Sequence, residues 1–252
     1  MRDRPPARGR ARLRVAAWLS LLTGLASPLG GAPPAEVAGA VAPPAEAELA
    51  LRSLAHHVVD GSDPRGLEIA LEAYYRYRSE RPGVVQKPYL YYVDLGLDAR
   101  SPRGYVFDME RLELIEGPFT VAHGSGSSAT RDAVPMVFSN VPGSHASSLG
   151  LYLTRETYTF RGRSGGRAYQ SVGLRLRGES VGFNDAAEER GIVVHGAPYV
   201  TPSWAGRSEG CPAMEPERAE RLLPLLAGGA VVFIFSPHDE RWLTHGPWAR
   251  AE

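Results

Sequence analysis

Residues 191–214 place a histidine and the only cysteine of the chain close together in sequence. An apolar run ends at His195-Gly196. Fifteen residues separate His195 from Cys211, which lies in the segment Ser-Glu-Gly-Cys-Pro just ahead of a predicted helix. A thiol near its free pKa is only a few per cent ionised at neutral pH, so it needs a base or a cation to become a ready nucleophile. A histidine held at the end of a strand takes up that proton and later donates it to a leaving amine.

The turn before the cysteine is suited to hold a developing negative charge. Gly210 lets the backbone turn tightly and leaves its amide uncovered. The consecutive amides of Glu209, Gly210 and Cys211 are therefore candidates for an oxyanion hole. For each residue alone there is a structural alternative, because a lone cysteine also serves as an inert core residue and a lone histidine as a hydrogen-bonded core residue. The ordered combination favours the catalytic interpretation.

The first residues predict export. Six arginines lie within the first fourteen residues, and the apolar run Val15–Gly30 and small residues follow. This is the layout of a secretory signal peptide, which we assign to residues 1–32, with a Pro/Ala-rich linker over 33–48. An uncleaved membrane anchor is the alternative. We expect the protein to be exported to the periplasm or cell envelope, with no stable membrane insertion after signal cleavage. A lone cysteine there forms no internal disulfide.

Composition excludes some partners. Beyond the arginine-rich start, 22 basic residues stand against 27 acidic ones, so a mildly acidic body gives no reason to expect nucleic-acid binding. No metal-ligand spacing and no phosphate-cradling glycine loop is present. We therefore expect no metal and no cofactor.

The elements that must position these residues are mostly strands. Apolar spacing predicts short helices within 49–88, the second starting at Asp63-Pro64, and another over 215–227. β-Branched, aromatic and leucine-rich runs predict strands at 89–95, 104–108, 119–122, 149–154, 172–177, 191–195 and 230–235. The sequence thus predicts a mainly β (α+β) catalytic domain over 89–237, sandwich-like or barrel-like, after a helical N-terminal segment at 49–88 and before a tail at 238–252.

With these residues in view, the chain resembles the murein L,D-transpeptidase (YkuD-type) catalytic domain of exported bacterial proteins. The family pattern is His-Gly, a loop of similar length, then Ser/Thr-His-Gly-Cys; here His195-Gly196 is followed by Ser208-Glu209-Gly210-Cys211. The resemblance continues through FTVAHGSGSS, SSLGLY and AVVFIF, over roughly residues 89–236. It implies an L,D-transpeptidase-type β fold.

The resemblance also implies roles. Cys211 is then the nucleophile, His195 its base, and the Gly196 carbonyl orients the imidazole. The donor and the acceptor are peptidoglycan stem peptides, and carbapenems acylate the cysteine. Glu209 stands where many members have a histidine; an inward carboxylate raises a thiol pKa, so we expect this side chain to point away from the sulfur.

Further residues are candidates for substrate binding, and alternatives to transfer remain. The candidates are His123, Ser125, Asn184, Arg207 and Ser208; His123 alternatively bonds a nearby turn, and Arg207 alternatively is a solvated loop residue. With water as acceptor, the same acyl-enzyme gives an L,D-carboxypeptidase or a murein hydrolase. Loss of the active site gives a cell-wall binding protein.

Overall fold

The computed structural model of the protein describes residues 45–248. Its helices are α1 (Ala45–Leu54), α2 (Pro64–Glu80), α3 (Pro216–Leu226) and α4 (Glu240–His245), with 3-10 turns at Ala55–His57 and Ser125–Ser127. The predicted signal peptide and most of the predicted linker lie outside the described residues. Within residues 45–248, no helix combines the length and the apolar character needed to cross a membrane.

One mixed sheet of eight strands organises the fold, in the order β11-β7-β6-β5-β12-β1-β2-β3. Its strands are β1 (Tyr89–Asp94), β2 (Gly104–Asp108), β3 (Glu113–Phe119), β5 (Gly150–Ser164), β6 (Arg167–Gly178), β7 (Val193–Gly196), β11 (Ala213–Met214) and β12 (Val231–Phe235). Two small sheets pair β4 (His123–Gly124) with β10 (Arg207–Ser208), and β8 (Val200–Thr201) with β9 (Trp204–Ala205). The predicted mainly β (α+β) class is confirmed, and one large sheet contains most of the strands.

The N-terminal helices belong to the same core as the sheet. Asp63 caps α2 by accepting a hydrogen bond from the Arg65 amide at 3.0 Å, and Pro64 starts the helix. Gly66 allows the helix to approach the sheet, since a Cβ there would lie 2.2 Å from the Tyr92 hydroxyl. The helices predicted at 49–88 therefore form in large part, and their buried side chains join the core of the strands rather than a separate segment.

The C-terminal residues also join this core. Residues 238–252 were expected to form a tail, whereas α4 occupies part of them and its Trp242 is fully buried. The Trp242 ring packs at 5.9 Å from the Phe233 ring and 6.0 Å from the Phe235 ring, both on β12. The Trp242 indole thus packs against the β12 side chains on one face of the sheet.

Most predicted strands form, and one was misplaced. Residues 104–108 form β2 as predicted, but of 119–122 only Phe119 lies in a named strand, β3. The chain then leaves the large sheet, and Ala122 forms an isolated bridge to Ala213 through a 2.8 Å bond from its amide. This path brings the following strand β4 to β10, which ends at Ser208, shortly before Cys211.

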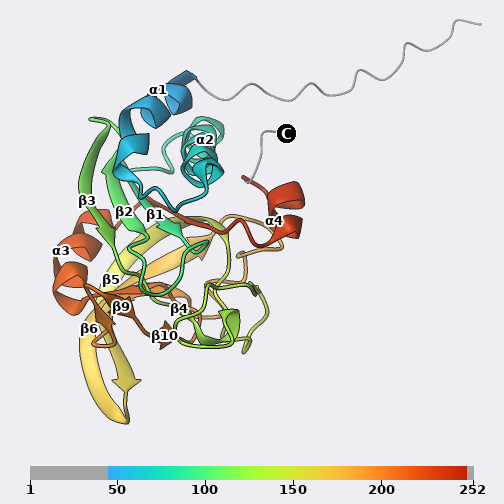
Figure 1. The fold of residues 1–252 in the computed structure, drawn as a ribbon. Helices are drawn as coiled ribbons and strands as arrows, with labels where there is room; N and C mark the ends of the chain where they lie inside the picture. Colours follow the sequence, from blue (N-terminus) through green and yellow to red (C-terminus); the bar gives the residue numbers. More distant parts are fainter. Residues whose placement is uncertain (1–44, 249–252) are drawn as a thin grey trace, which may run out of the picture. The chain divides into compact units, whose positions relative to one another are not determined.

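The β5–β6 hairpin is the longest element pair and extends away from the body (Figure 1). Only 149–154 and 172–177 had been predicted as strands, because residues beyond them are mostly exposed and rich in arginine and threonine. Gly165 and Gly166 form the turn with φ of 56° and 79°, a left-handed conformation that favours glycine.

Candidate active site

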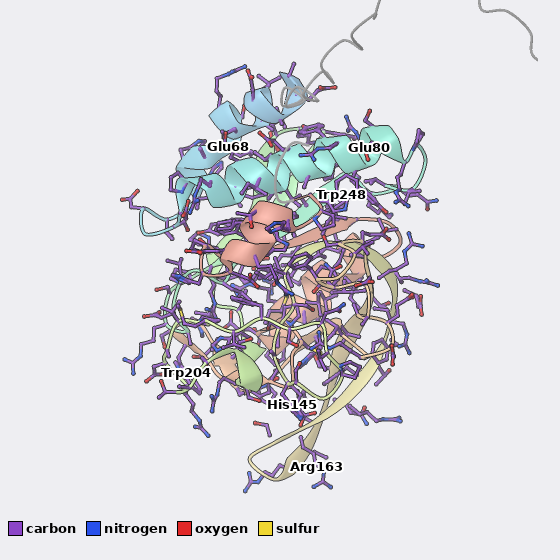
Figure 2. All side chains as sticks on the ribbon, turned by 90° about the vertical axis from the view of Figure 1, so that its right-hand side faces the viewer. Glu68, Glu80, His145, Arg163, Trp204 and Trp248 are labelled. Carbon is purple, nitrogen blue, oxygen red and sulfur yellow. The ribbon has the colours of Figure 1, made fainter. Side chains whose placement is uncertain are left out.

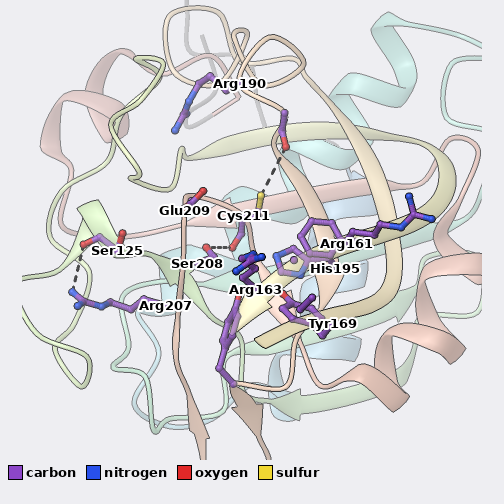
Figure 3. Close-up of a pocket in the computed structure, with 15 residues that line it drawn as sticks. Ser125, Arg161, Arg163, Tyr169, Arg190, His195, Arg207, Ser208, Glu209 and Cys211 are labelled. Atoms are coloured by element: carbon purple, nitrogen blue, oxygen red, sulfur yellow. Dashed lines mark hydrogen bonds between the residues drawn. The ribbon is translucent and has the colours of Figure 1, made fainter. Parts of the chain in front are cut away.

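A parallel ladder between β7 and β11 brings the histidine and the cysteine together. His195 on β7 is in register with Ala213 on β11, only two residues after Cys211. The bond from the His195 amide to the Pro212 carbonyl, at 3.4 Å, extends this register towards the cysteine. Figure 3 shows both side chains at the same cavity.

The His195 imidazole is held in one orientation. It is 2% exposed, its Nδ1 lies 3.1 Å from the Gly196 carbonyl oxygen, and Phe160 stacks on it with ring centroids 3.9 Å apart. A carbonyl oxygen only accepts, so Nδ1 carries the proton and Nε2 is left as the basic nitrogen. Burial lowers the pKa of His195 to about 4, although the Gly196 bond acts in the opposite direction. The imidazole is therefore neutral at pH 7.

The Cys211 thiol is half-buried and uncharged at neutral pH. Its Sγ donates to the Gly191 carbonyl at 3.9 Å, and no hydrogen bond within residues 45–248 joins it to the imidazole. Burial raises the pKa of the thiol, and the Glu209 carboxylate adds to the rise. A hydrogen bond from the Val193 backbone and the positive charge of Arg190 act against it. Cys211 and His195 therefore line the cavity as a neutral thiol and a neutral imidazole.

Arg190 is fixed where it acts on the thiol. Its guanidinium donates to the carbonyls of Ser139 at 2.6 Å and Ala146 at 2.7 Å, and to the Ser148 hydroxyl at 3.1 Å. Every one of these acceptors is neutral, so the positive charge of Arg190 is not cancelled by a carboxylate. No motif singled this residue out in the sequence.

Ser208 closes the turn that presents the cysteine. Its hydroxyl donates to the Cys211 carbonyl at 2.6 Å and accepts from the Gly210 amide at 3.2 Å. Gly210 has a φ of +125°, which only glycine adopts readily. The Gly210 amide, expected in the oxyanion hole, is therefore already engaged, whereas the Cys211 amide makes no hydrogen bond among the described residues. Ser208 shapes the turn in this structure.

Glu209 is exposed to solvent, and it is also one of the residues that line the cavity. We expected its side chain to point away from the sulfur. Its carboxylate nevertheless contributes to the raised pKa of the Cys211 thiol.

The cavity has a volume of about 920 Å³ and a basic lining (Figure 3). Arg161 and Arg163 reach it from β5, Arg190 from the loop before β7, and Arg207 from β10. The predicted residues that line it are Ser125, His195, Arg207, Ser208, Glu209 and Cys211. The lining residues that sequence reasoning missed are Phe160, Arg161, Gly162, Arg163, Ala168, Tyr169, Arg190, Gly191 and Tyr199. Many of these lie on the β5–β6 hairpin, where alternating aromatic and arginine residues were the available signal.

The structure does not place His123 or Asn184 at the cavity. His123 is fully buried, with Nδ1 accepting from Arg103 at 2.8 Å and Nε2 at 2.7 Å from the Ser128 hydroxyl. Asn184, also fully buried, accepts from the Ser180 amide at 2.8 Å and donates to the Leu151 carbonyl at 2.9 Å. The polar atoms of both side chains form hydrogen bonds inside the protein, which corrects the expectation that they contact substrate.

Comparison with known proteins identifies the family. The model of the L,D-transpeptidase catalytic domain matches residues 60–235. No curated protein matches the chain. Among solved structures, an L,D-transpeptidase from Mycobacterium smegmatis is 13% identical with a TM-score of 0.35, and the match covers 59% of each chain. An L,D-transpeptidase (Yku) from Stackebrandtia nassauensis is 18% identical with a TM-score of 0.35, covering 77% of this chain and 92% of that one.

The chain therefore spans less than two thirds of the length of the mycobacterial relative. The family model, by contrast, matches well over half of this chain and includes both β7 and the Cys211 turn. The chain belongs to the L,D-transpeptidase catalytic-domain family.

Proposed function

We propose that the protein is a cysteine-dependent L,D-transpeptidase that acts on peptidoglycan stem peptides through an acyl-enzyme at Cys211. One observation carries the proposal: Cys211 and His195 line one cavity, and the Gly196 carbonyl fixes the imidazole with Nε2 as its basic nitrogen. We also propose that it acts after export, in the periplasm or cell envelope.

The pKa shifts determine how the thiol is activated. His195 has a pKa of about 4 and the thiol pKa is raised, so a preformed thiolate–imidazolium pair is disfavoured at neutral pH. The thiol instead leaves the Gly191 carbonyl, turns to Nε2, and gives up its proton as sulfur attacks the carbonyl carbon. Proton transfer in step with attack avoids a separate thiolate–imidazolium pair, so the two charges form only as the imidazolium and the oxyanion of the intermediate.

The remaining steps return this proton. Attack forms a bond from Sγ to the carbonyl carbon at the L-centre of the diamino acid, and the Cys211 amide faces the resulting oxyanion. The C–N bond to the terminal D-alanine then breaks, and the imidazolium protonates the departing amine. The amine of a second stem attacks the thioester, His195 takes its proton, and the thiol leaves as a thiolate that recovers the proton.

Mass spectrometry of the protein incubated with stem tetrapeptide tests the proposal. We expect an adduct on Cys211 and cross-linked dimers, no adduct in Cys211→Ser, and slow acylation in His195→Ala, with exposed His245→Ala as the control variant. Tripeptide without dimers would assign water as the acceptor. Absence of an adduct with both tetrapeptide and a carbapenem would reject a cysteine acyl-enzyme and favour a binding protein.

A further inference from the structure

A second cavity adjoins the one that holds the cysteine. It has a volume of about 430 Å³ and shares Ser125, Arg163, Tyr199 and Arg207 with the first cavity. Its other lining residues are Arg131, Ser164, Gly165, Trp204 and Gly206. Neither Cys211 nor His195 lines it, so a molecule bound there lies beside the acylation site and leaves that site open.

The second cavity is positively charged and contains no acid. Arg131, Arg163 and Arg207 line it, and none of its lining residues is Asp or Glu. Within residues 45–248, none of these three arginines forms an ion pair, whereas nearby Arg100 pairs with Asp132 at 3.1 Å. Arginines with their charge uncompensated are thus gathered at this cavity, and they favour an anionic occupant.

Part of this lining is fixed in position. The Arg207 guanidinium is half-buried and donates to the Ser128 carbonyl at 2.9 Å, which orients it. The Trp204 indole donates to Asp132 at 2.8 Å, so an aromatic wall is held beside the arginines. A planar guanidinium matches a carboxylate with two parallel hydrogen bonds, a geometry that a carboxamide cannot reproduce.

The third arginine lies on a projecting element. Figure 2 shows Arg163 near the end of the β5–β6 hairpin, which extends from the body. Because Arg163 lines both cavities, a ligand that it contacts in the second cavity lies close to one bound at the first. This continuity points to two peptides bound side by side.

We infer that the second cavity is an acceptor subsite that selects a stem peptide with a free carboxylate over the same peptide with a carboxamide, through Arg131, Arg163 and Arg207. The inference rests on the proposed function, since it names the acceptor of the same acyl group. The donor occupies the larger cavity at Cys211, and the amine of the acceptor approaches the thioester from the arginine-lined side.

Binding of the acceptor is measured apart from catalysis. Titration calorimetry follows two acceptor peptides, one with free carboxylates and one with carboxamides, on the wild-type protein and on Arg131→Gln, Arg163→Gln and the double variant. The matched control is Arg167→Gln, which removes an exposed arginine of the same hairpin that lines neither cavity. Removing one charged hydrogen-bond partner weakens binding by about tenfold.

We expect the wild-type protein to prefer the free carboxylate by at least about tenfold, and each lining variant to reduce this preference while Arg167→Gln keeps it. Binding of the free carboxylate also weakens as salt is raised. Equal affinity for the two peptides in the wild-type protein, or an equal loss in Arg167→Gln and Arg131→Gln, would overturn the inference. Acylation of Cys211 by the donor alone is measured separately, so failure of the proposed function is recognised by a missing adduct.

Discussion

Two buried neutral histidines are expected to lower the free energy of unfolding as the pH falls below 6.5. Burial lowers the pKa of His123 to about 3, with the charges of Arg103 and Arg207 adding to the effect, and burial lowers that of His195 to about 4, both from 6.5. The unfolded chain takes up a proton at each histidine as the pH falls through 6.5, whereas the folded chain does not. Stability contributed by the neutral rings is therefore complete above pH 6.5 and is lost as the pH falls.

The size of the effect follows from these values. Between pH 7 and pH 5, each histidine lowers the free energy of unfolding by about 2 kcal/mol, or about 4 kcal/mol together. Asp63 and Asp98 have lowered pKa values, so the stability that their carboxylates contribute is lost only in more acidic solution, below this pH range. Asp94 has a raised pKa and therefore adds stability as the pH falls. The pH dependence of the wild-type protein alone thus mixes several groups, and a variant of one histidine isolates its contribution.

The discriminating variant is His123→Gln. Glutamine supplies one acceptor for Arg103 and one donor for Ser128, as the neutral ring does, and it does not titrate. We expect urea unfolding, followed by tryptophan fluorescence at pH 7 and pH 5, to show a loss about 2 kcal/mol smaller in His123→Gln than in the wild-type protein. Exposed His245→Gln is the control. An equal loss in His123→Gln and the wild-type protein would refute the assignment of a buried neutral ring.

Three further predictions concern single side chains. Arg190→Gln removes the cation that lowers the thiol pKa, so the pH profile of Cys211 alkylation by iodoacetamide shifts to higher pH; an unshifted profile contradicts this. Trp242→Ala removes a fully buried ring and lowers the unfolding free energy by about 3–5 kcal/mol in urea titrations, whereas a loss near zero would mean that α4 is not part of the core. Thr154→Val removes bonds to the Leu226 carbonyl and the Gly229 and Ala230 amides, at a cost of about 3 kcal/mol by thermal unfolding; an unchanged melting temperature argues against these bonds.

Sequence patterns located the elements that bury apolar side chains. Residues 89–94, 104–108 and 231–235 form β1, β2 and β12, and every position of β2 and β12 is buried. Such strands read as continuous apolar runs. β3 was missed because it is the edge strand of the sheet and six of its seven positions are exposed or half-buried, so charged residues replace the apolar pattern.

The site was predictable where chemistry depends on residue type, and not where it depends on long-range placement. Cys211 and His195 were identified by type and spacing, and the structure places both at one cavity. The role of His123 was misjudged because its surroundings are set by Arg103, twenty residues earlier, and no local pattern reports that contact. The arginines of the β5–β6 hairpin were overlooked for the same reason, since they reach the cavity only through the fold.

The ladder between β7 and β11 fixes the position of the Cys211 turn independently of the loop that joins the two strands. His195 and Ala213 are held in register by backbone bonds, so the intervening chain need not have one fixed length to keep the Cys211 turn next to His195. The turn at Pro202-Ser203, between β8 and β9, is exposed and carries Trp204 beside it. A longer or shorter turn here would therefore change the residues beside Trp204, which lines the second cavity, while the ladder keeps the Cys211 turn next to β7.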